Sequence, residues 1–408
     1  MTRLSIAAAA REAGDRPAVI TKDRTLTFAE CAASLPAPAS AVIATPTVAT
    51  ILAIYRALED ARPLVLVHAK LAPNEQARQL AMVPDGAFVL FTSGSTGTAR
   101  GVILSRAAIL AAADASAARL GWRDDDRWLS CLPMAHAGGL SIVVRCLAAR
   151  RPVVLHEGEL DAEAVLALAR SARATLASLV PAQLAGFAGA CPPHLRAVIL
   201  GGAAAAPSLV ADAVARGWPI LPSYGLTETF GQIATALVPG GVPVVLPGVE
   251  LSAGETLRVR GPMLATAYLD GTPIAPELVT ADLGRVDADG SVHVLGRRDD
   301  VIITGGENVH PLEIEAVLAA TPGVRAACAF AIADAQWGQV VAVALATDAE
   351  FEPERARARW HDVLPSHARP RRLAVVAQLP QLPSGKLDRR AIATLPTVAV
   401  VYDRDPAM

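Results

Sequence analysis

Phe91-Thr92-Ser93-Gly94-Ser95-Thr96-Gly97-Thr98-Ala99-Arg100-Gly101 is the stretch that decides the fold of this chain. It follows a short apolar run, residues 87–91, and precedes a helical pattern from about Arg106 to Leu120. Glycine permits close backbone approach, serine and threonine add hydroxyl donors, and Arg100 adds positive charge. The pattern predicts a buried strand, a loop and a helix, with loop N–H groups wrapped around a chain of phosphates.

Two other glycine-rich loops do not fit this stretch. A Walker A loop requires Gly-x4-Gly-Lys-Ser/Thr, and this spacing does not occur here. A hydrolase nucleophile elbow requires Gly-x-Ser-x-Gly, but Ser93 occupies the first glycine position when the pattern is centred on Ser95. Taken alone, the loop leaves one alternative open, a plain Gly/Ser turn between two core elements.

Composition indicates a globular protein of two or three domains. The chain has 408 residues, of which 52% are hydrophobic and 19% charged, which excludes a disordered protein. The net charge of −2 gives no general attraction to nucleic acid or to anionic membranes. The five cysteines are scattered without a C-x-x-C pair, so we expect neither a zinc site nor a disulfide framework, and a reducing, cytoplasmic location.

Strand-like and helical patterns alternate along the first part of the chain. Residues 18–30 predict a hairpin that leads into a helix, residues 50–61 a helix, and residues 63–68 a strand. This alternation predicts a mostly parallel, doubly wound sheet. Residues 1–12 favour an amphipathic helix over a signal peptide, and the apolar segment 41–55 is too short to span a bilayer, so we expect no membrane span.

The segment from Thr92 to Gly101 resembles the Thr-Ser-Gly-Ser-Thr-Gly-x-Pro-Lys-Gly loop of the adenylate-forming enzymes, which include acyl- and aryl-CoA ligases, luciferases and adenylation domains. Ala99 replaces the usual proline and Arg100 the usual lysine. Arginine keeps the charge, but as a planar fork. The resemblance implies that Thr92 takes part in catalysis and that ATP phosphates are bound by the loop residues Thr92, Ser93, Gly94, Ser95, Thr96, Gly97 and Arg100.

Further motifs of this superfamily follow in order. Tyr224-Gly225-Leu226-Thr227-Glu228 resembles the Tyr-Gly-x-Thr-Glu segment that stacks on adenine, contacts the α-phosphate through threonine and holds Mg²⁺ through glutamate. A magnesium ion commonly takes one or two carboxylates beside phosphates and waters. Gly201-Gly202-Ala203 resembles the segment that borders the adenine. The resemblance thus assigns nucleotide binding to Gly201, Gly202, Ala203, Tyr224, Gly225 and Thr227, and catalysis with the metal to Glu228.

The C-terminal part carries the remaining motifs. Asp282, preceded by Ala281 where the superfamily has glycine, resembles the acid that binds the ribose hydroxyls, and Arg297 the arginine that binds ribose or phosphate. Asp299 falls at the superfamily's interdomain hinge, and Gly305-Gly306 at the loop that lines its CoA tunnel. Lys386, in Pro383-Ser384-Gly385-Lys386, falls at its catalytic lysine; a solvated turn lysine is the alternative.

The segment Pro133-Met-Ala-His136-Ala-Gly-Gly139-Leu-Ser141-Ile-Val-Val-Arg145 resembles the acyl pocket of the o-succinylbenzoate–CoA ligases of menaquinone biosynthesis. His136 is the candidate that covers the phosphates or contacts the carboxylate, and Gly139 and Ser141 line the pocket. Arg145 has two interpretations. It is either a surface arginine with a buried stem or the partner of a second substrate carboxylate.

The resemblance implies an α/β protein with a large N-terminal domain of doubly wound sheets plus a β-rich section, residues 1–297, and a small mobile α+β domain, residues 298–408. It implies Mg²⁺ as cofactor, and a carboxylic acid, ATP and CoA as substrates, joined through an acyl-adenylate. Three alternatives stay open: another aryl, alicyclic or medium-chain acid; a carrier-protein thiol as acceptor; and a non-catalytic homologue. A homodimer is compatible with the sequence.

Overall fold

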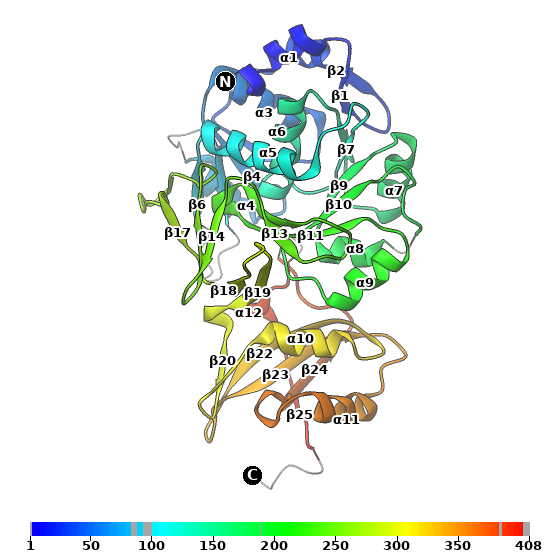
Figure 1. The fold of residues 1–408 in the computed structure, drawn as a ribbon, viewed down its shortest axis with the longest axis vertical. Coiled ribbons are helices and arrows are strands. Elements are labelled where there is room, and N and C mark those ends of the chain that lie inside the picture. The colour runs from blue at the N-terminus through cyan, green and yellow to red at the C-terminus, as the bar shows by residue number, and fades with distance from the viewer. Residues whose placement is uncertain (1, 83–87, 93–99, 188, 383–385, 403–408) are drawn as a thin grey trace.

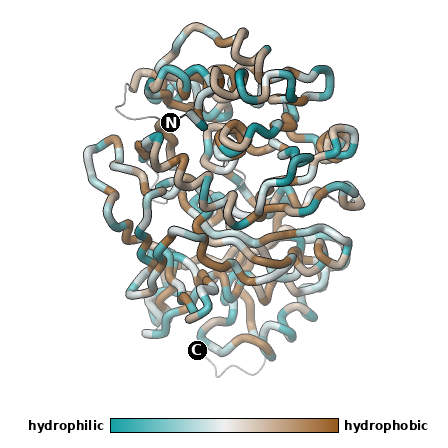
Figure 2. Tube along the Cα trace, turned by 45° about the horizontal axis from the view of Figure 1, so that its top comes forward, coloured by the Kyte–Doolittle hydropathy of each residue, from teal (hydrophilic) through white to brown (hydrophobic). Residues whose placement is uncertain are grey.

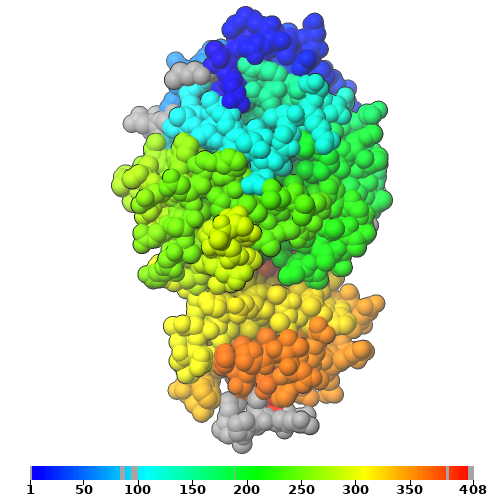
Figure 3. All heavy atoms as spheres, in the orientation of Figure 1, coloured from blue at the N-terminus to red at the C-terminus, as the bar shows by residue number. Residues whose placement is uncertain are grey.

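The computed structural model describes residues 2–82, 88–92, 100–187, 189–382 and 386–402. Figure 1 shows two bodies, a large one above that contains the N-terminus and a small one below that contains the C-terminal strands and helices. In Figure 3 the outline of the molecule narrows where the two bodies meet. Among the described residues, no helix is both long enough and apolar enough to cross a bilayer.

The main sheet of the large domain is mixed. Its central strands are parallel, as the alternation of strands and helices predicts, while β2, β12 and β13 run antiparallel to their neighbours. The order across the described sheet is β13 (Pro243–Val245), β12 (Gly231–Ala236), β11 (Ile220–Leu226), β10 (Ala197–Leu200), β9 (Leu176–Leu179), β7 (Trp128–Ser130), β8 (Val153–Leu155), β1 (Pro17–Ile20) and β2 (Thr25–Thr27).

The second sheet of the large domain carries the predicted phosphate loop. Its order is β16 (Ala267–Tyr268), β6 (Gly101–Leu104), β5 (Phe88–Phe91), β4 (Leu64–His68) and β3 (Ala41–Ala44). Strands β3, β4 and β5 are parallel, and β4 is buried along its whole length, as a strand covered on both faces should be. Two small sheets follow in the chain: β14 (Glu250–Ala253), β15 (Leu257–Arg260) and β17 (Glu277–Val279); and β18 (Asp282–Val286) with β19 (Val292–Arg297).

Helices cover these sheets and pack into more than one apolar core. They are α1 (Ile6–Ala13), α2 (Phe28–Ala33), α3 (Val48–Asp60), α4 (Pro73–Leu80), α5 (Arg106–Leu120), α6 (Ala137–Ala149), α7 (Ala162–Ser171), α8 (Pro181–Gly186) and α9 (Pro207–Ala215). A single apolar cluster joins both large sheets through α3, α5 and α6. Figure 2 accordingly shows hydrophobic trace in the interior and hydrophilic segments mostly at the periphery.

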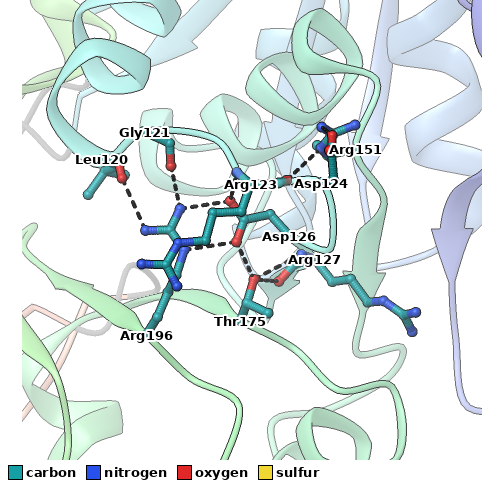
Figure 4. A network of polar contacts seen from close by, with 9 residues as sticks. All are labelled: Leu120, Gly121, Arg123, Asp124, Asp126, Arg127, Arg151, Thr175 and Arg196. Atoms are coloured by element: carbon teal, nitrogen blue, oxygen red, sulfur yellow. Dashed lines mark hydrogen bonds and ion pairs between the residues drawn. The ribbon is translucent and has the colours of Figure 1, made fainter.

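The loop before β7 is fixed to the rest of the sheet by a buried ion pair. Arg196 donates from Nε and Nη2 to the two carboxylate oxygens of Asp126, at 2.8 and 2.7 Å. Thr175 Oγ1 and the Arg123 N–H also donate to Asp126. Figure 4 shows these groups converging on Asp126, with the Asp124–Arg151 pair at the surface nearby. The network joins the starts of β7, β9 and β10.

The small domain is built on a sheet with helices on both faces. Its strands are β20 (Ile302–Thr304), β21 (Glu307–Val309), β22 (Val324–Asp334), β23 (Gly338–Thr347), β24 (Arg372–Val376) and β25 (Val398–Ala399), and its helices α10 (Pro311–Ala319), α11 (Pro353–Val363) and α12 (Arg389–Ile392). Alternate residues of β23 enter different cores. Val341, Val343 and Leu345 pack with α10 and α11, and the intervening alanines with α12.

Candidate active site

The predicted phosphate loop connects two antiparallel strands. Residues 93–99 lie outside the described residues, but β5 before them and β6 after them pair directly, with Phe91 opposite Gly101. The prediction of a strand–loop–helix unit is therefore wrong, because β6 separates the loop from α5. At the start of α5, Ser105 Oγ accepts the Ala108 N–H as the cap of that helix. At the base of the hairpin, Thr92 N–H donates to Arg100 O at 2.9 Å.

Lys386 of the small domain lies in the site of the large domain. It is held by a hairpin in which Gln381 bridges Leu387 and the Leu382 N–H donates to Lys386 O. Burial lowers the pKa of Lys386, and the nearby Arg297 lowers it further, while Asp282 and Glu228 oppose the shift. The predicted metal, ribose and lysine residues are therefore close enough to interact electrostatically. A solvated turn lysine does not describe this environment.

The predicted ribose acid is already organised by two site residues. Tyr224 Oη donates to Asp282 Oδ2 at 2.7 Å, and Arg297 Nη1 donates to Asp282 Oδ1 at 3.3 Å. Burial, reinforced by Asp282, raises the pKa of Tyr224, so its hydroxyl keeps its proton. The Asp282 N–H is bound by Thr280 Oγ1. These contacts join β11 to the β18–β19 pair and fix the direction of the carboxylate.

The predicted metal ligand Glu228 is oriented by a residue that the sequence motifs do not include. Tyr268 Oη donates to Glu228 Oε1 at 2.9 Å, and burial followed by Glu228 raises the pKa of that hydroxyl. The Arg100 guanidinium lies 3.5 Å from the centroid of the Tyr268 ring and pairs with Asp270 at 2.9 Å. A chain of contacts therefore runs from the phosphate loop to the metal candidate.

The donors present fit a magnesium ion that is bound mainly by phosphates and water. Glu228 Oε2 has no hydrogen bond within the part of the chain described, which leaves one carboxylate oxygen available. The same part contains no group of three or more His, Cys, Asp or Glu side chains that could hold a metal by themselves. Mg²⁺ in nucleotide sites commonly uses one or two carboxylates, so a single glutamate is sufficient.

His136 stands at the start of α6, where its side chain does not cap the helix. Burial lowers its pKa to about 3, with the charges of His68 and Lys386 adding to the shift, so the ring is neutral at pH 7. Ser141 Oγ donates to Gly138 O. Gly139 allows the helix to lie against the preceding loop, because a Cβ there would lie 2.4 Å from Pro133 O.

Two further glycines of the motifs are required, one by packing and the other by its backbone conformation. A Cβ on Gly225 would lie 1.9 Å from Gly231 O, so the strand pair β11–β12 admits no side chain there. Gly202 has φ +81°, a backbone conformation that favours glycine. Gly201 and Ala203 lie on the same loop between β10 and α9, as the strand-then-glycine pattern predicts. Thr227 begins the 3₁₀ turn η2 (Thr227–Thr229) directly after β11.

Arg145 lies apart from these residues and is not on the surface. It is 3% exposed, with its guanidinium 5.5 Å from the centroid of the Trp128 ring. Its Nε and Nη2 atoms are buried without a hydrogen-bond partner among the described residues. Burial lowers its pKa to about 10, so it stays charged at pH 7. No space for a water molecule remains among its neighbours, which include Ala113, Ser116, Trp122, Trp128 and Leu176. The surface interpretation is wrong.

Residues 38–258 match the family described as AMP-binding enzyme, and residues 313–386 match its C-terminal domain. The first match alone spans more than half of the chain. This chain belongs to the AMP-binding enzyme family.

Similar proteins agree with this assignment. The chain is 34% identical over 334 residues to a 2-succinylbenzoate–CoA ligase of Bacillus licheniformis, covering 76% of this chain and 70% of that protein. A structure of o-succinylbenzoate CoA synthetase from Bacillus subtilis with its acyl-adenylate intermediate superposes with a TM-score of 0.84, at 26% identity over 97% of this chain and 99% of that one. A structure of the Bacillus subtilis enzyme with ATP and magnesium gives a TM-score of 0.80 at 25% identity, and the match covers 95% of this chain and 98% of that one.

The predicted hinge and CoA residues of this AMP-binding enzyme lie on the link between the two domains and on the first turn of the small domain. Asp299 belongs to the 3₁₀ turn η3 (Arg298–Asp300) that links β19 to β20, and its carboxylate is half exposed beside Arg298. Gly305 and Gly306 form the turn between β20 and β21 with φ of +59° and +89°. Figure 1 shows β20 running along the edge of the small domain, away from the large one.

Three residues around the site were not singled out from the sequence: His68, Tyr268 and Asp270. The sequence pattern could have indicated His68, because a polar residue there ends an apolar strand, and that strand lies beside the one that enters the phosphate loop. No such pattern indicated Tyr268 and Asp270, since they are separated from their partners Glu228 and Arg100 by 40 and 170 positions in the chain. Only the pairing of β16 with β6 brings them to the site.

Proposed function

We propose that this chain is an ATP-dependent 2-succinylbenzoate–CoA ligase that works through an acyl-adenylate. The observation that carries the proposal is that Lys386 of the small domain is close enough to Arg297, Asp282 and Glu228 of the large domain for their charges to shift its pKa. The relatives named above support the choice of acid and of CoA. The reaction joins the acid and ATP to acyl-adenylate and pyrophosphate, and then exchanges AMP for CoA.

In the first half-reaction the substrate carboxylate attacks the α-phosphate, so no side-chain nucleophile is required. Catalysis consists of positioning and charge stabilisation. Tyr224 stacks on the adenine, while its hydroxyl fixes Asp282 beside Arg297 for the ribose. Lys386 bridges the carboxylate and the α-phosphate, where its positive charge stabilises the negative charge of the transition state. Thr92 and the loop that follows it hold the outer phosphates.

Glu228 would hold the magnesium ion, with Tyr268 fixing the carboxylate through Oε1. When bound, the ion neutralises phosphate charge and helps the pyrophosphate to leave. Arg100 lies over Tyr268, and its charge adds to the attraction for the phosphates. Arg100 replaces the more common lysine, and the Tyr268 ring and the Asp270 carboxylate hold its guanidinium in place.

The second half-reaction requires the small domain to turn. We propose residues 1–297 and 298–408 as the two moving units, with Asp299 as the hinge. Rotation withdraws Lys386 and brings the Gly305–Gly306 turn to the site, where it lines a passage for the pantetheine arm. The CoA thiolate then attacks the acyl carbonyl and AMP leaves. Hinge rotation of a small domain is a common way for one enzyme to present two sets of residues to the same site in turn.

Arg145 is our candidate partner for the carboxylate of 2-succinylbenzoate that does not react. Its support is chemical, because two nitrogens of this buried guanidinium have no hydrogen-bond partner in the described parts of the chain and can still bind an anion. Contact requires the side chain to turn away from Trp128, because its present surroundings hold no space for a ligand. His136, Gly139 and Ser141 line the proposed acyl pocket at the other end of α6.

A substrate panel tests the proposal. Purified protein is mixed with Mg·ATP, CoA and, in turn, 2-succinylbenzoate, benzoate, cyclohexanecarboxylate, coumarate or octanoate, and pyrophosphate, AMP and thioester are measured with and without CoA. We expect thioester with 2-succinylbenzoate alone. Turnover of another acid alone would keep the mechanism and contradict the choice of substrate. A burst of pyrophosphate without thioester would favour a carrier-protein thiol as the acceptor. Inactivity with every acid and acceptor would favour a non-catalytic homologue.

The Arg145→Met variant then tests the second-carboxylate role. We expect KM for 2-succinylbenzoate to rise at least tenfold, the loss of one charge-assisted contact, with KM for a monocarboxylic acid unchanged. Arg145→Lys keeps the charge and serves as the matched control, with a smaller rise. Equal losses for both kinds of acid would contradict the role and leave Arg145 as a structural residue.

We also propose a cytoplasmic location and retain the homodimer as a prediction. All five cysteines are free thiols in the structure, which suits a reducing compartment. Fractionation of cells that express the tagged protein checks the location, and light scattering on the purified protein over a concentration series checks the oligomer. A mass of one chain at every concentration would contradict the dimer.

A further inference from the structure

His68 is a buried polar residue at the active site for which the motifs provide no role. It ends β4 and is only 7% exposed. Its ring lies 5.0 Å from that of His136 between centroids, with the planes tilted by 38°. A polar side chain buried to this extent normally has its hydrogen bonds satisfied. His68 therefore requires either a partner within the fold or one that arrives with a ligand.

The hydrogen bonding of His68 fixes which ring nitrogen carries the proton. The Lys70 N–H donates to His68 Nδ1 at 3.0 Å, so Nδ1 accepts and, in the neutral ring, Nε2 bears the hydrogen. Burial, with Lys70 adding to it, lowers the pKa of His68 and keeps the ring neutral at pH 7. His68 Nε2 is itself buried and has no hydrogen-bond partner among the described residues. Within the described part of the chain, the ring thus presents an N–H donor that has no acceptor.

The register of the sheet sets His68 level with the residue at which the predicted phosphate loop begins. Leu64 pairs with Phe88 and Val65 with Val89 in the parallel pair β4–β5. The same register, carried to the ends of both strands, sets His68 level with Thr92, where the loop begins. On its other side the His68 ring contacts His136, which is close enough to Lys386 for that charge to lower its pKa. His68 is therefore level with Thr92, the last described residue before that loop, and in ring contact with His136, a residue proposed for the carboxylate.

We propose that His68 is a substrate-binding residue whose Nε2–H donates a hydrogen bond to an anionic oxygen of the bound substrates. The oxygen belongs either to the phosphates of ATP or to the carboxylate of the acid. The inference rests on the proposed function for its ligands, but not on which acid is the substrate. A neutral N–H group is sufficient for such a bond, because an anionic oxygen is a strong hydrogen-bond acceptor. His68 transfers no proton and makes no covalent bond.

Two substitutions distinguish the loss of the Nε2–H donor from a loss of folding stability. His68→Gln retains an N–H group near the position of Nε2. His68→Asn retains an oxygen near the position of Nδ1 that can accept from the Lys70 N–H, but places no donor at Nε2. Titration calorimetry on the full-length protein gives Kd for Mg·ATP, AMP, pyrophosphate and 2-succinylbenzoate, and thermal unfolding shows that each variant is folded. Binding is measured without turnover, so an effect on catalysis alone does not enter.

We expect His68→Asn to weaken at least one of these ligands tenfold or more, and His68→Gln to weaken it less than threefold. A loss for Mg·ATP and pyrophosphate with AMP unchanged assigns the bond to the outer phosphates, and a loss for the acid assigns it to the carboxylate. Unchanged Kd values in folded His68→Asn would overturn this inference alone. Absence of nucleotide binding by the unsubstituted protein would overturn the proposed function as well.

Discussion

Replacement of Arg196 by methionine should destabilise the large domain strongly. The Asp126 carboxylate has no exposed side-chain area, and Arg196 binds both of its oxygens at 2.7 and 2.8 Å. In the variant, Asp126 keeps its negative charge in a buried site with only Thr175 Oγ1 and the Arg123 N–H as donors. Removal of one partner of a buried ion pair costs about 3–5 kcal/mol, because the remaining charge stays desolvated.

Urea unfolding followed by tryptophan fluorescence measures this cost, since Trp122, Trp128 and Trp218 all lie in the large domain. With a slope of about 3 kcal/mol per molar urea for a domain of this size, the midpoint should fall by about 1 M or more. Asp124→Ala is the matched control, because Asp124 pairs with Arg151 in the same network while 99% exposed, and its midpoint should not move.

The double variant Asp126→Asn/Arg196→Met separates the ion pair from general packing. With the buried charge gone, we expect it to be more stable than Arg196→Met alone. Burial raises the pKa of Asp126, but the hydrogen bonds from Arg196, the Arg123 N–H and Thr175 outweigh it, so that the pKa is lowered. Its stabilisation is therefore complete above the unfolded pKa near 4 and is lost as the pH falls through the lower folded pKa. A loss below about 1 kcal/mol for Arg196→Met, or additive effects in the double variant, would refute this reasoning.

Three other substitutions test the site. Lys386→Ala should slow ATP–pyrophosphate exchange about 10²–10³-fold, and the rate of thioester formation from supplied acyl-adenylate should change only a few-fold. In the unsubstituted protein, the rate of exchange should fall with rising pH at a lower pH than for an ordinary lysine, because the pKa of Lys386 is lowered. Tyr268→Phe should raise the Mg²⁺ concentration for half-maximal exchange about fivefold to tenfold, with KM for the acid unchanged, because Glu228 loses its orienting hydroxyl; an unchanged Mg²⁺ dependence would contradict that role. Gly225→Ala should abolish nucleotide binding in calorimetry, since its Cβ would lie 1.9 Å from Gly231 O, and a variant that binds AMP normally would show that this strand pair can shift.

Much of the architecture was predictable from the order of its elements. The hairpin and helix of residues 18–30, the helix α5 and the strands β4 and β5 all occur where apolar patterns and turns place them. The pattern failed at the phosphate loop, where β6, four residues long, lies between the loop and α5. Gly101-Val-Ile-Leu104 is as apolar as the start of a buried helix, and only pairing with β5 and β16 distinguishes it as a strand.

The sequence by itself determined which chemical groups the site contains. Glycine, hydroxyl, carboxylate and lysine positions occur in an order that identifies the superfamily, and the family match agrees. It also determined the local backbone, because capping residues and glycines act over a few positions. The tertiary structure decided which side chains meet. Tyr268 reaches Glu228, His68 reaches His136, and Arg145 turns toward Trp128. Such contacts follow from strand register and helix packing across the whole domain, and no local pattern encodes them.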